Sequence, residues 1–307
     1  MTTTGRPRVL VFEPEHLGHQ PGFVRALAAW LGRHAVPFDV SFLVGEPLLA
    51  RLREDHAAGL AGPAGTEVRV LTDGELQACT AGSLRTKAMA RWRVLQRHLR
   101  LSGATHGHAL FLDPFQLPLA LGMRLGSGHT LSGILFRPSV HYSQASGTRA
   151  PWRERWRDAL KRRLYLRMLH NPDLRLVLTL DPYFPAYARQ AFESGHKVVA
   201  LPDPVLGEAS GAGAVADDVR AALQAGRATF LLFGALDARK GVPATLRALA
   251  RVPAEARLGL RVVLAGRLDA DCRARVAELT AGLRDADRDS QSLCVVDRFL
   301  TTAELDW

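Results

Sequence analysis

Residues 230–243 read FLLFGALDARKGVP and form the most informative stretch of the sequence. The apolar run at 230–233 predicts a buried strand, Gly234 lets the chain turn, and Pro243 suits the first turn of a helix. The loop between strand and helix carries two cations and a second glycine, namely Arg239, Lys240 and Gly241. A strand followed by a glycine-bounded loop and a helix is typical of parallel sheets that are covered by helices.

The same turn predicts an anion site. Unpaired N–H groups at the helix start and the positive end of the helix dipole attract a phosphate. Lys240 and Arg239 would add full charges, which stabilise a departing diphosphate. A solvated turn with two surface cations stays open as the alternative. The loop does not match G-x-G-x-x-G or G-x-x-x-x-G-K-[ST], which disfavours dinucleotide dehydrogenases and P-loop NTPases.

Short apolar runs alternate with helical segments along the chain. Strands are predicted at 8–13, 38–44, 68–71, 108–112, 134–136, 175–180 and 197–201, and then at 229–233, 261–265 and 293–297. The pattern predicts an α/β fold with two Rossmann-like, doubly wound domains, at 1–206 and 217–307, joined by the Gly-, Ala- and Ser-rich linker 207–216. Because only three strands and two full helices of the second domain precede Trp307, we expect that domain to be incomplete, with an unprotected sheet edge.

Composition limits the class of protein. With 307 residues, of which 47% are hydrophobic, the chain is long enough for two globular domains. It shows no signal peptide and no apolar run of the roughly 20 residues that span a membrane, so we expect a cytoplasmic protein. Three scattered cysteines match neither a disulfide framework nor a zinc site. His106 and His108 lack a third ligand, so no metal site is predicted and we expect them at the surface.

Polar residues follow three predicted strands of the first domain. Gly18 and His19 follow the first strand, Asp113 follows the strand at 108–112, and His141 comes soon after 134–136. Ligands of open α/β sheets bind beyond the carboxyl ends of the strands, so we expect these residues at one edge. Asp113 could instead cap the following helix, and His19 could be an ordinary loop residue.

These segments resemble the retaining GT-B glycosyltransferases grouped as glycosyltransferase family 4. That family's second domain opens with a strand, G-R-L-x-x-x-K-G, a helix and a strand ending in A-G. Here residues 233–241 read FGALDARKG, 262–266 read VVLAG, and 295–300 read VVDRFL. In the first domain, Gly18-His19 resembles the family's glycine-rich loop, and residues 201–205 (LPDPV) resemble its closing segment.

The resemblance implies transfer of a sugar from a nucleotide-sugar donor, such as a UDP- or GDP-sugar, to a saccharide or a lipid-linked saccharide. It implies no metal and no bound cofactor. Asp113 and His141 would act on the acceptor side as catalytic residues. The donor phosphates would lie against six residues: Gly18, His19, Gly234, Arg239, Lys240 and Gly241.

Two departures from the family pattern matter. Ala235 stands where the family has an arginine, and Arg239 is our hypothetical substitute. The family's E-x(7)-E pair would lie beyond Trp307, so we expect little or no transferase activity from these 307 residues. An inactive glycosyltransferase-like fragment, or a protein that binds anionic ligands, is therefore the alternative.

A strongly basic helix is predicted at 152–168, which reads WRERWRDALKRRLYLRM. Apolar residues recur at every fourth position, as Trp152, Trp156, Leu160, Leu164 and Met168, beside seven Lys or Arg. We expect this stripe to dock on the sheet, with peripheral attachment to the inner face of an acidic membrane as the alternative. The formal charge of +10 also fits nucleic acid, but no recognition motif is present and aromatic residues are only 7%, so we expect no nucleic-acid partner.

Overall fold

The computed structural model describes residues 6–16, 20–55, 66–136, 138–142, 152–202, 217, 219, 228–257, 259–286 and 292–298. The chain divides into two compact units, Met1–Val205 and Leu206–Trp307. The predicted linker 207–216 and the helix expected after residue 301 lie outside the described residues.

The first unit contains a seven-stranded sheet in the order β3-β2-β1-β4-β5-β6-β7. All neighbouring strands are parallel. The strands are β1 (Arg8–Glu13), β2 (Asp39–Val44), β3 (Thr66–Val70), β4 (His106–Ala109), β5 (Thr130–Leu135), β6 (Leu174–Thr179) and β7 (Val198–Ala200). The strand order reverses between β1 and β4, and such a reversal leaves a crevice at the carboxyl ends of the two strands.

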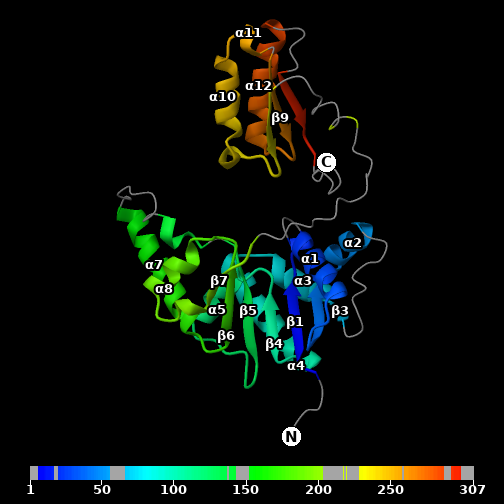
Figure 1. Ribbon diagram of the computed structural model, residues 1–307, viewed down its shortest axis with the longest axis vertical. Coiled ribbons are helices and arrows are strands. Elements are labelled where there is room, and N and C mark those ends of the chain that lie inside the picture. Colours follow the sequence, from blue (N-terminus) through cyan, green and yellow to red (C-terminus); the bar gives the residue numbers. More distant parts are fainter. Residues whose placement is uncertain are drawn as a thin grey trace. The chain divides into compact units, whose positions relative to one another are not determined.

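Helices cover both faces of this sheet (Figure 1). One face packs against α1 (Gln20–Arg33) and α2 (Glu46–Asp55). The other packs against α4 (Leu84–Ser102), α5 (Gln116–Ala120), α7 (Trp152–His170) and α8 (Phe184–Ala191), while α3 (Asp73–Thr80) contacts α4. The described residues of this unit also form three short 3-10 helices: η1 (Asp113–Phe115), η2 (Ser139–His141) and η3 (Gly195–Lys197). The unit is therefore doubly wound, as predicted.

The second unit has a three-stranded parallel sheet in the order β10-β9-β8. The described part of this unit contains the strands β8 (Ala228–Phe233), β9 (Leu260–Ala265) and β10 (Leu293–Val296). It also contains the helices η4 (Ala238–Lys240), α10 (Val242–Arg251), α11 (Ala254–Arg257) and α12 (Ala270–Ala286). Leu246 of α10 and Val276 of α12 pack with Val262 and Leu264 of β9. The strand-turn-helix unit predicted from residues 230–243 is thus present.

The prediction that residues 230–233 form a buried strand is wrong in one respect. Phe230, Leu231 and Phe233 are exposed, although they do form the strand. Among the described strands, β8 pairs only with β9, so it lies at an edge of the sheet. An apolar sequence run therefore predicted the strand but not its burial.

His106 and His108 were expected at the surface, and this is also wrong. Both are half-buried on β4, where His106 contacts Thr130 Oγ1 and Ser132 Oγ at 2.7 Å, and His108 contacts Ser132 Oγ at 2.8 Å. Burial lowers the pKa of both imidazoles, that of His108 to about 4. Among the described residues, no cluster of His, Cys, Asp or Glu is arranged to hold a metal ion.

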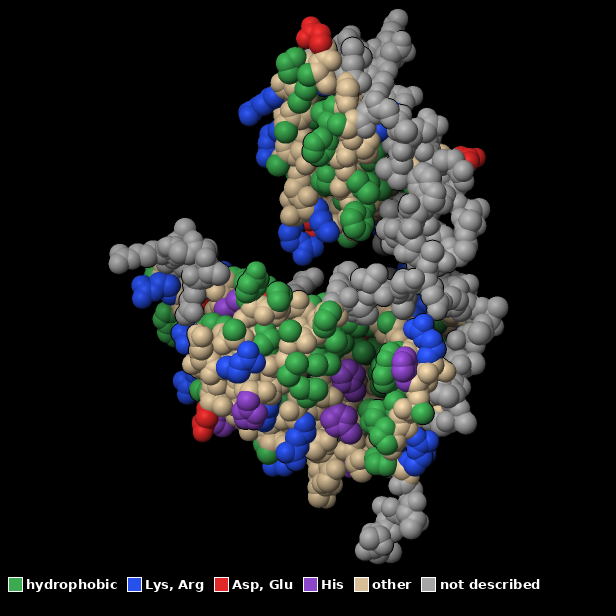
Figure 2. Space-filling model, in the orientation of Figure 1, with side chains coloured by type: hydrophobic (Ala, Val, Ile, Leu, Met, Phe, Trp, Pro, Cys, Tyr) green, Lys and Arg blue, Asp and Glu red, His purple; other side chains and the backbone are tan. Residues whose placement is uncertain are grey.

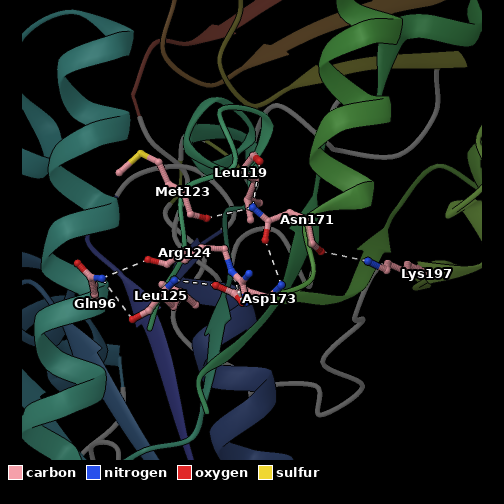
Figure 3. A network of polar contacts seen from close by, with 8 residues as sticks. All are labelled: Gln96, Leu119, Met123, Arg124, Leu125, Asn171, Asp173 and Lys197. Carbon is pink, nitrogen blue, oxygen red and sulfur yellow. Dashed lines mark hydrogen bonds and ion pairs between the residues drawn. The ribbon is translucent and has the colours of Figure 1, made fainter. Parts of the chain in front are cut away.

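A polar network ties together the loops that precede β5, β6 and β7 (Figure 3). Asp173 accepts hydrogen bonds from Arg124 Nε at 2.9 Å and from the Leu125 N–H at 2.7 Å. Asn171 donates to the carbonyls of Leu119 and Met123, both at 3.0 Å. The network belongs to the amino ends of the strands, opposite the edge where ligands of such sheets bind, so we interpret it as structural.

The basic helix α7 forms as predicted, but its apolar stripe does not dock as expected. Met168 is buried, whereas Trp152, Trp156 and Leu160 are exposed. Lys and Arg side chains are spread over the face of the first unit seen in Figure 2, where acidic ones are rare. No helix in the described ranges combines the length and apolar character needed to cross a membrane.

Candidate functional site

A pocket of about 470 Å³ lies beside the carboxyl ends of β1 and β4, at the reversal of strand order. Its polar lining consists of two carboxylates, three cations and an amide: Glu15, Asp113, Arg85, Lys87, Arg91 and Gln116. The residues come from the segment after β1, from α4, and from the segment after β4. A concave site with a few convergent polar groups at this position is the default place for a ligand in such a sheet.

A buried charge cluster supports one wall of the pocket. Glu13, the last residue of β1, is fully buried, and its Oε1 accepts the N–H of Glu15 at 2.8 Å. Arg91 is also buried, donates through Nε to the Cys79 carbonyl at 2.9 Å, and forms an ion pair with Glu15. Burial raises the pKa of Glu13 to about 8, against the opposing effects of the Glu15 N–H and of Arg91. The sequence interpretation missed Glu13 and Arg91; the available signal was a carboxylate directly at the end of an apolar strand.

Asp113 lines the pocket at the start of η1. One oxygen of its carboxylate accepts a hydrogen bond from the N–H of Phe136, at 3.1 Å. Phe136 directly follows β5, so this contact joins the segments after two neighbouring strands and holds the carboxylate at the carboxyl ends of the strands. The position is the one predicted, and the catalytic role stays a prediction.

His141 lies in η2, beyond the end of β5, and is only 6% exposed. Its Nε2 is 3.1 Å from Oδ2 of Asp181, an ion-pair distance, although the direction does not suit a hydrogen bond. Tyr142 donates its hydroxyl to the same oxygen, at 3.0 Å. The centre of the His141 ring also lies 5.5 Å from the centre of the Phe184 ring and 5.6 Å from the centre of the Tyr187 ring. Asp181, which the sequence interpretation missed, follows β6 as Asp113 follows β4.

Tyr165 of α7 connects these two parts of the sheet edge. Its ring lies 5.6 Å from Phe184, which in turn contacts His141. Burial and the nearby charge of Asp113 raise the pKa of Tyr165, while a hydrogen bond from its neighbour Gln116 opposes the rise. The structure therefore places Asp113 and His141 in one neighbourhood, on either side of a buried tyrosine.

The second unit carries the predicted anion loop. Gly234 follows β8 with φ +97, and Gly241 precedes α10 with φ +79. No side chain of the described residues caps α10, so the helix presents the N–H groups of its first turn, apart from the one that Pro243 lacks. Lys240 and Arg239 are exposed beside this helix end.

Asp237 shapes the loop before α10. Its carboxylate accepts the N–H of Lys240 at 3.0 Å and pairs with Arg239 at 3.1 Å. These contacts lower the pKa of Asp237, the Lys240 N–H most strongly. Arg239 is thus partly neutralised, and Lys240 is the stronger candidate for a ligand phosphate. Gly18 and His19, the other two predicted phosphate contacts, lie outside the described residues.

Comparison with known proteins identifies the fold class. No known sequence family matches the chain, and no curated protein matches it by sequence. Solved structures of the two-domain, Rossmann-like GT-B fold do match, so the predicted fold class is confirmed. The narrower resemblance to family 4, and an incomplete second domain, stay predictions.

Three solved structures illustrate the similarity. Sucrose-phosphate synthase from Thermosynechococcus elongatus is 18% identical with a TM-score of 0.59, over 98% of this chain and 72% of the synthase. Anabaena HepE, solved with UDP and glucose, is 15% identical with a TM-score of 0.54, over 98% of this chain and 71% of HepE. WaaG, a glycosyltransferase involved in lipopolysaccharide biosynthesis, is 14% identical with a TM-score of 0.55, over 97% and 72%. At these identities the likeness is one of fold.

Proposed function

We propose that the chain is a glycosyltransferase that moves a sugar from a nucleotide-sugar donor to a saccharide or lipid-linked saccharide, with retention of configuration. The observation that carries the proposal is the pocket at the reversal of strand order, lined by Glu15, Asp113 and three cations. The solved GT-B structures with UDP add support, because HepE holds UDP and glucose on the same fold.

The donor diphosphate would bind at the start of α10. The first-turn N–H groups and the helix dipole favour a dianionic group there, and Lys240 adds a full charge. As the bond between sugar and phosphate breaks, negative charge grows on the leaving phosphate oxygen. Preorganised donors around that oxygen stabilise the transition state more than the ground state, which is how the loop would accelerate the reaction.

The acceptor would bind in the pocket of the first unit. Asp113 and Glu15 can accept hydrogen bonds from sugar hydroxyls, and Arg85 and Lys87 suit an acceptor that carries an acidic group. His141 is nearly buried and has little surface to offer a sugar. We therefore assign His141 a positioning role, in which it holds Asp181 and Tyr142 at the sheet edge.

Donor consumption tests the proposal. The full chain would be incubated with UDP- and GDP-hexoses and a panel of saccharide and lipid-linked acceptors, with release of nucleoside diphosphate as the readout. The departures at Ala235 and beyond Trp307 predict little or no activity, so turnover by this chain would itself decide in favour of the transferase, and that turnover should fall at least about tenfold in Asp113→Asn. The matched control is Asp73→Asn, an exposed aspartate of α3 in the same unit, which should leave turnover unchanged. Equal rates in both variants would contradict the assigned role of Asp113.

A nucleotide-binding protein without turnover is the second candidate, and Ala235 favours it. This exposed residue follows Gly234, where the family that the sequence resembles carries an arginine. If the missing cation limits donor binding, Ala235→Arg should tighten binding of UDP or GDP about tenfold, since a charge-assisted hydrogen bond contributes about 1.5 to 3 kcal/mol. Binding of UDP or GDP, together with no release of nucleoside diphosphate from any nucleotide sugar, would support this second candidate.

A further inference from the structure

The first half of α7 presents large apolar side chains to solvent. Trp152 is 69% exposed and Trp156 is 71% exposed, and Leu160 one turn further on is 63% exposed. Two tryptophans and a leucine in a row on one helix would normally be buried against the core. Their exposure therefore needs a reason that the fold of the first unit does not supply.

The helix meets its own core with a different face. Tyr165, Met168 and Leu169 are buried against the sheet in the second half of α7. Trp156 precedes Tyr165 by nine residues, which at about 100° per residue puts the two side chains on opposite sides of the helix. The sheet that anchors the second half of α7 therefore leaves the tryptophan face uncovered, and a shift of the helix along its axis would not bury both faces.

Cations border the tryptophan face. A groove of about 460 Å³ runs along it, lined by Trp152, Arg155, Trp156, Ala159, Leu160 and Arg163. The guanidinium of Arg153 lies 5.5 Å from the centre of the Trp152 ring, a cation-π distance. Residues 152–168 contain seven Lys or Arg against two acids, so the face complements a negatively charged surface.

We propose that the first half of α7, residues 152–163, binds the surface of an anionic lipid bilayer. The helix would lie in the plane of the interface, with both tryptophan rings at the level of the headgroups and Leu160 toward the acyl chains. Arg155 and Arg163 would contact lipid phosphates, each adding to the attraction. A bilayer explains why aromatic and aliphatic side chains share this face, because single-stranded nucleic acid would use the rings for stacking but would leave Leu160 without a partner. The inference is independent of the proposed transferase activity.

Vesicle flotation tests the inference with the full chain. The probes are vesicles of phosphatidylcholine alone and vesicles containing about one third phosphatidylglycerol, each at low and at high salt. We expect binding only to the anionic vesicles, weakened by salt because surface charges are screened. Tryptophan emission should shift to shorter wavelength on binding, because two of the five tryptophans enter the interface.

Matched variants distinguish the effect of this surface from the effect of any change in net charge or of any lost exposed tryptophan. Trp152→Ala with Trp156→Ala, and Arg155→Glu with Arg163→Glu, should each reduce vesicle partitioning at least about tenfold. The control for the first pair is Trp30→Ala, an exposed tryptophan of α1. The control for the second pair is Arg247→Glu with Arg251→Glu, two exposed arginines of α10 that give the same change in net charge. Both controls should bind vesicles like the unchanged chain.

Three results would overturn the inference. The first is no binding to anionic vesicles at low salt, and the second is equal binding by the Trp152/Trp156 variant. The third is that the same variant abolishes self-association, or abolishes binding of a labelled oligonucleotide, without changing vesicle binding. Circular dichroism of each variant would confirm that any loss of binding occurs in a folded chain.

Discussion

Oδ2 of Asp181 lies 3.1 Å from Nε2 of His141, across the carboxyl ends of β5 and β6. The other oxygen of Asp181 accepts the N–H groups of Tyr183 at 2.9 Å and of Phe184 at 3.2 Å, at the start of α8. One carboxylate therefore lies at ion-pair distance from an imidazole and also accepts two N–H groups at the start of a helix. A charge held this firmly can position its neighbours without touching a substrate.

Asp181→Asn keeps the shape of this side chain and removes its charge. If His141 acts by positioning, we expect turnover to fall about tenfold with little change in nucleotide affinity. The matched control is Glu193→Gln, since Glu193 pairs with His170 at 3.2 Å on the exposed surface. Steady-state kinetics and nucleotide titrations of both variants would check this. Equal effects of the two substitutions on turnover would contradict a special role for the His141 pair.

Glu13 should make the first unit less stable as pH rises. Its pKa is raised from 4.5 to about 8 by burial, so the folded chain binds the proton that the unfolded chain releases. The stabilising effect is full below pH 4.5 and is lost as pH rises toward 8, at about 1.4 kcal/mol per pH unit. Glu13→Gln should flatten this part of the pH profile and be more stable than the unchanged chain near pH 9.

Chemical denaturation between pH 5 and 9 measures this effect. Glu193→Gln, at an exposed position, is the matched control and should keep the pH profile of the unchanged chain. A Glu13→Gln profile parallel to that of the unchanged chain would mean that Glu13 titrates at its ordinary pKa in the folded protein.

Gly266 should be intolerant of any side chain. Its φ is +140, and a Cβ built on it would lie 1.9 Å from the carbonyl oxygen of Gly234. Gly266→Ala must therefore separate the ends of β8 and β9, and we expect a loss of about 3 kcal/mol from the second unit. Gly259→Ala is the matched control, because its nearest atom would be 3.9 Å away. Hydrogen exchange of β8 and β9 should rise in the first variant and stay unchanged in the second.

Asp173 should matter for stability and not for ligand binding. Asp173→Ala removes the acceptor of the buried Leu125 N–H as well as the partner of Arg124, so we expect a loss of about 2 kcal/mol. Arg124→Ala should lose clearly less stability than Asp173→Ala, because the arginine is largely exposed and the ion pair is screened. Denaturant titration of both variants shows which substitution lowers the free energy of unfolding more. A larger loss for Arg124→Ala would contradict the network as drawn in Figure 3.

The sequence predicted strands well where apolar residues run without interruption. Residues 8–13 were predicted as the first strand and form β1 with the same bounds. The fourth strand was predicted at 108–112 but forms at His106–Ala109. Strands were predicted from apolar runs, and the polar His106 and His108 interrupt the apolar pattern of this strand. The bounds of that strand are determined by its pairing with β1 on one side and β5 on the other, and not by local propensity.

The candidate site was predictable only in part. Asp113 and Lys240 could be found because each follows a strand, and the topology of each unit then places the residue at the carboxyl ends of the strands in its own sheet. Arg91 could not be found, since its pairing with Glu15 depends on how α4 packs against β1 across 76 residues of chain. The spacing of the tryptophans in α7 predicted a stripe, but spacing alone does not tell which face of a helix meets the core.

We propose above all that the start of α10 binds the diphosphate of a nucleotide sugar. Calorimetric titration of the chain with UDP and GDP measures this binding, with Lys240→Ala in η4 as the variant and Arg247→Ala, an exposed arginine of α10, as its matched control. We expect that one of the two nucleotides binds, that Lys240→Ala weakens its binding at least about tenfold, and that Arg247→Ala leaves it unchanged. Absence of binding by both nucleotides, or equal affinity of Lys240→Ala and the unchanged chain, would contradict it.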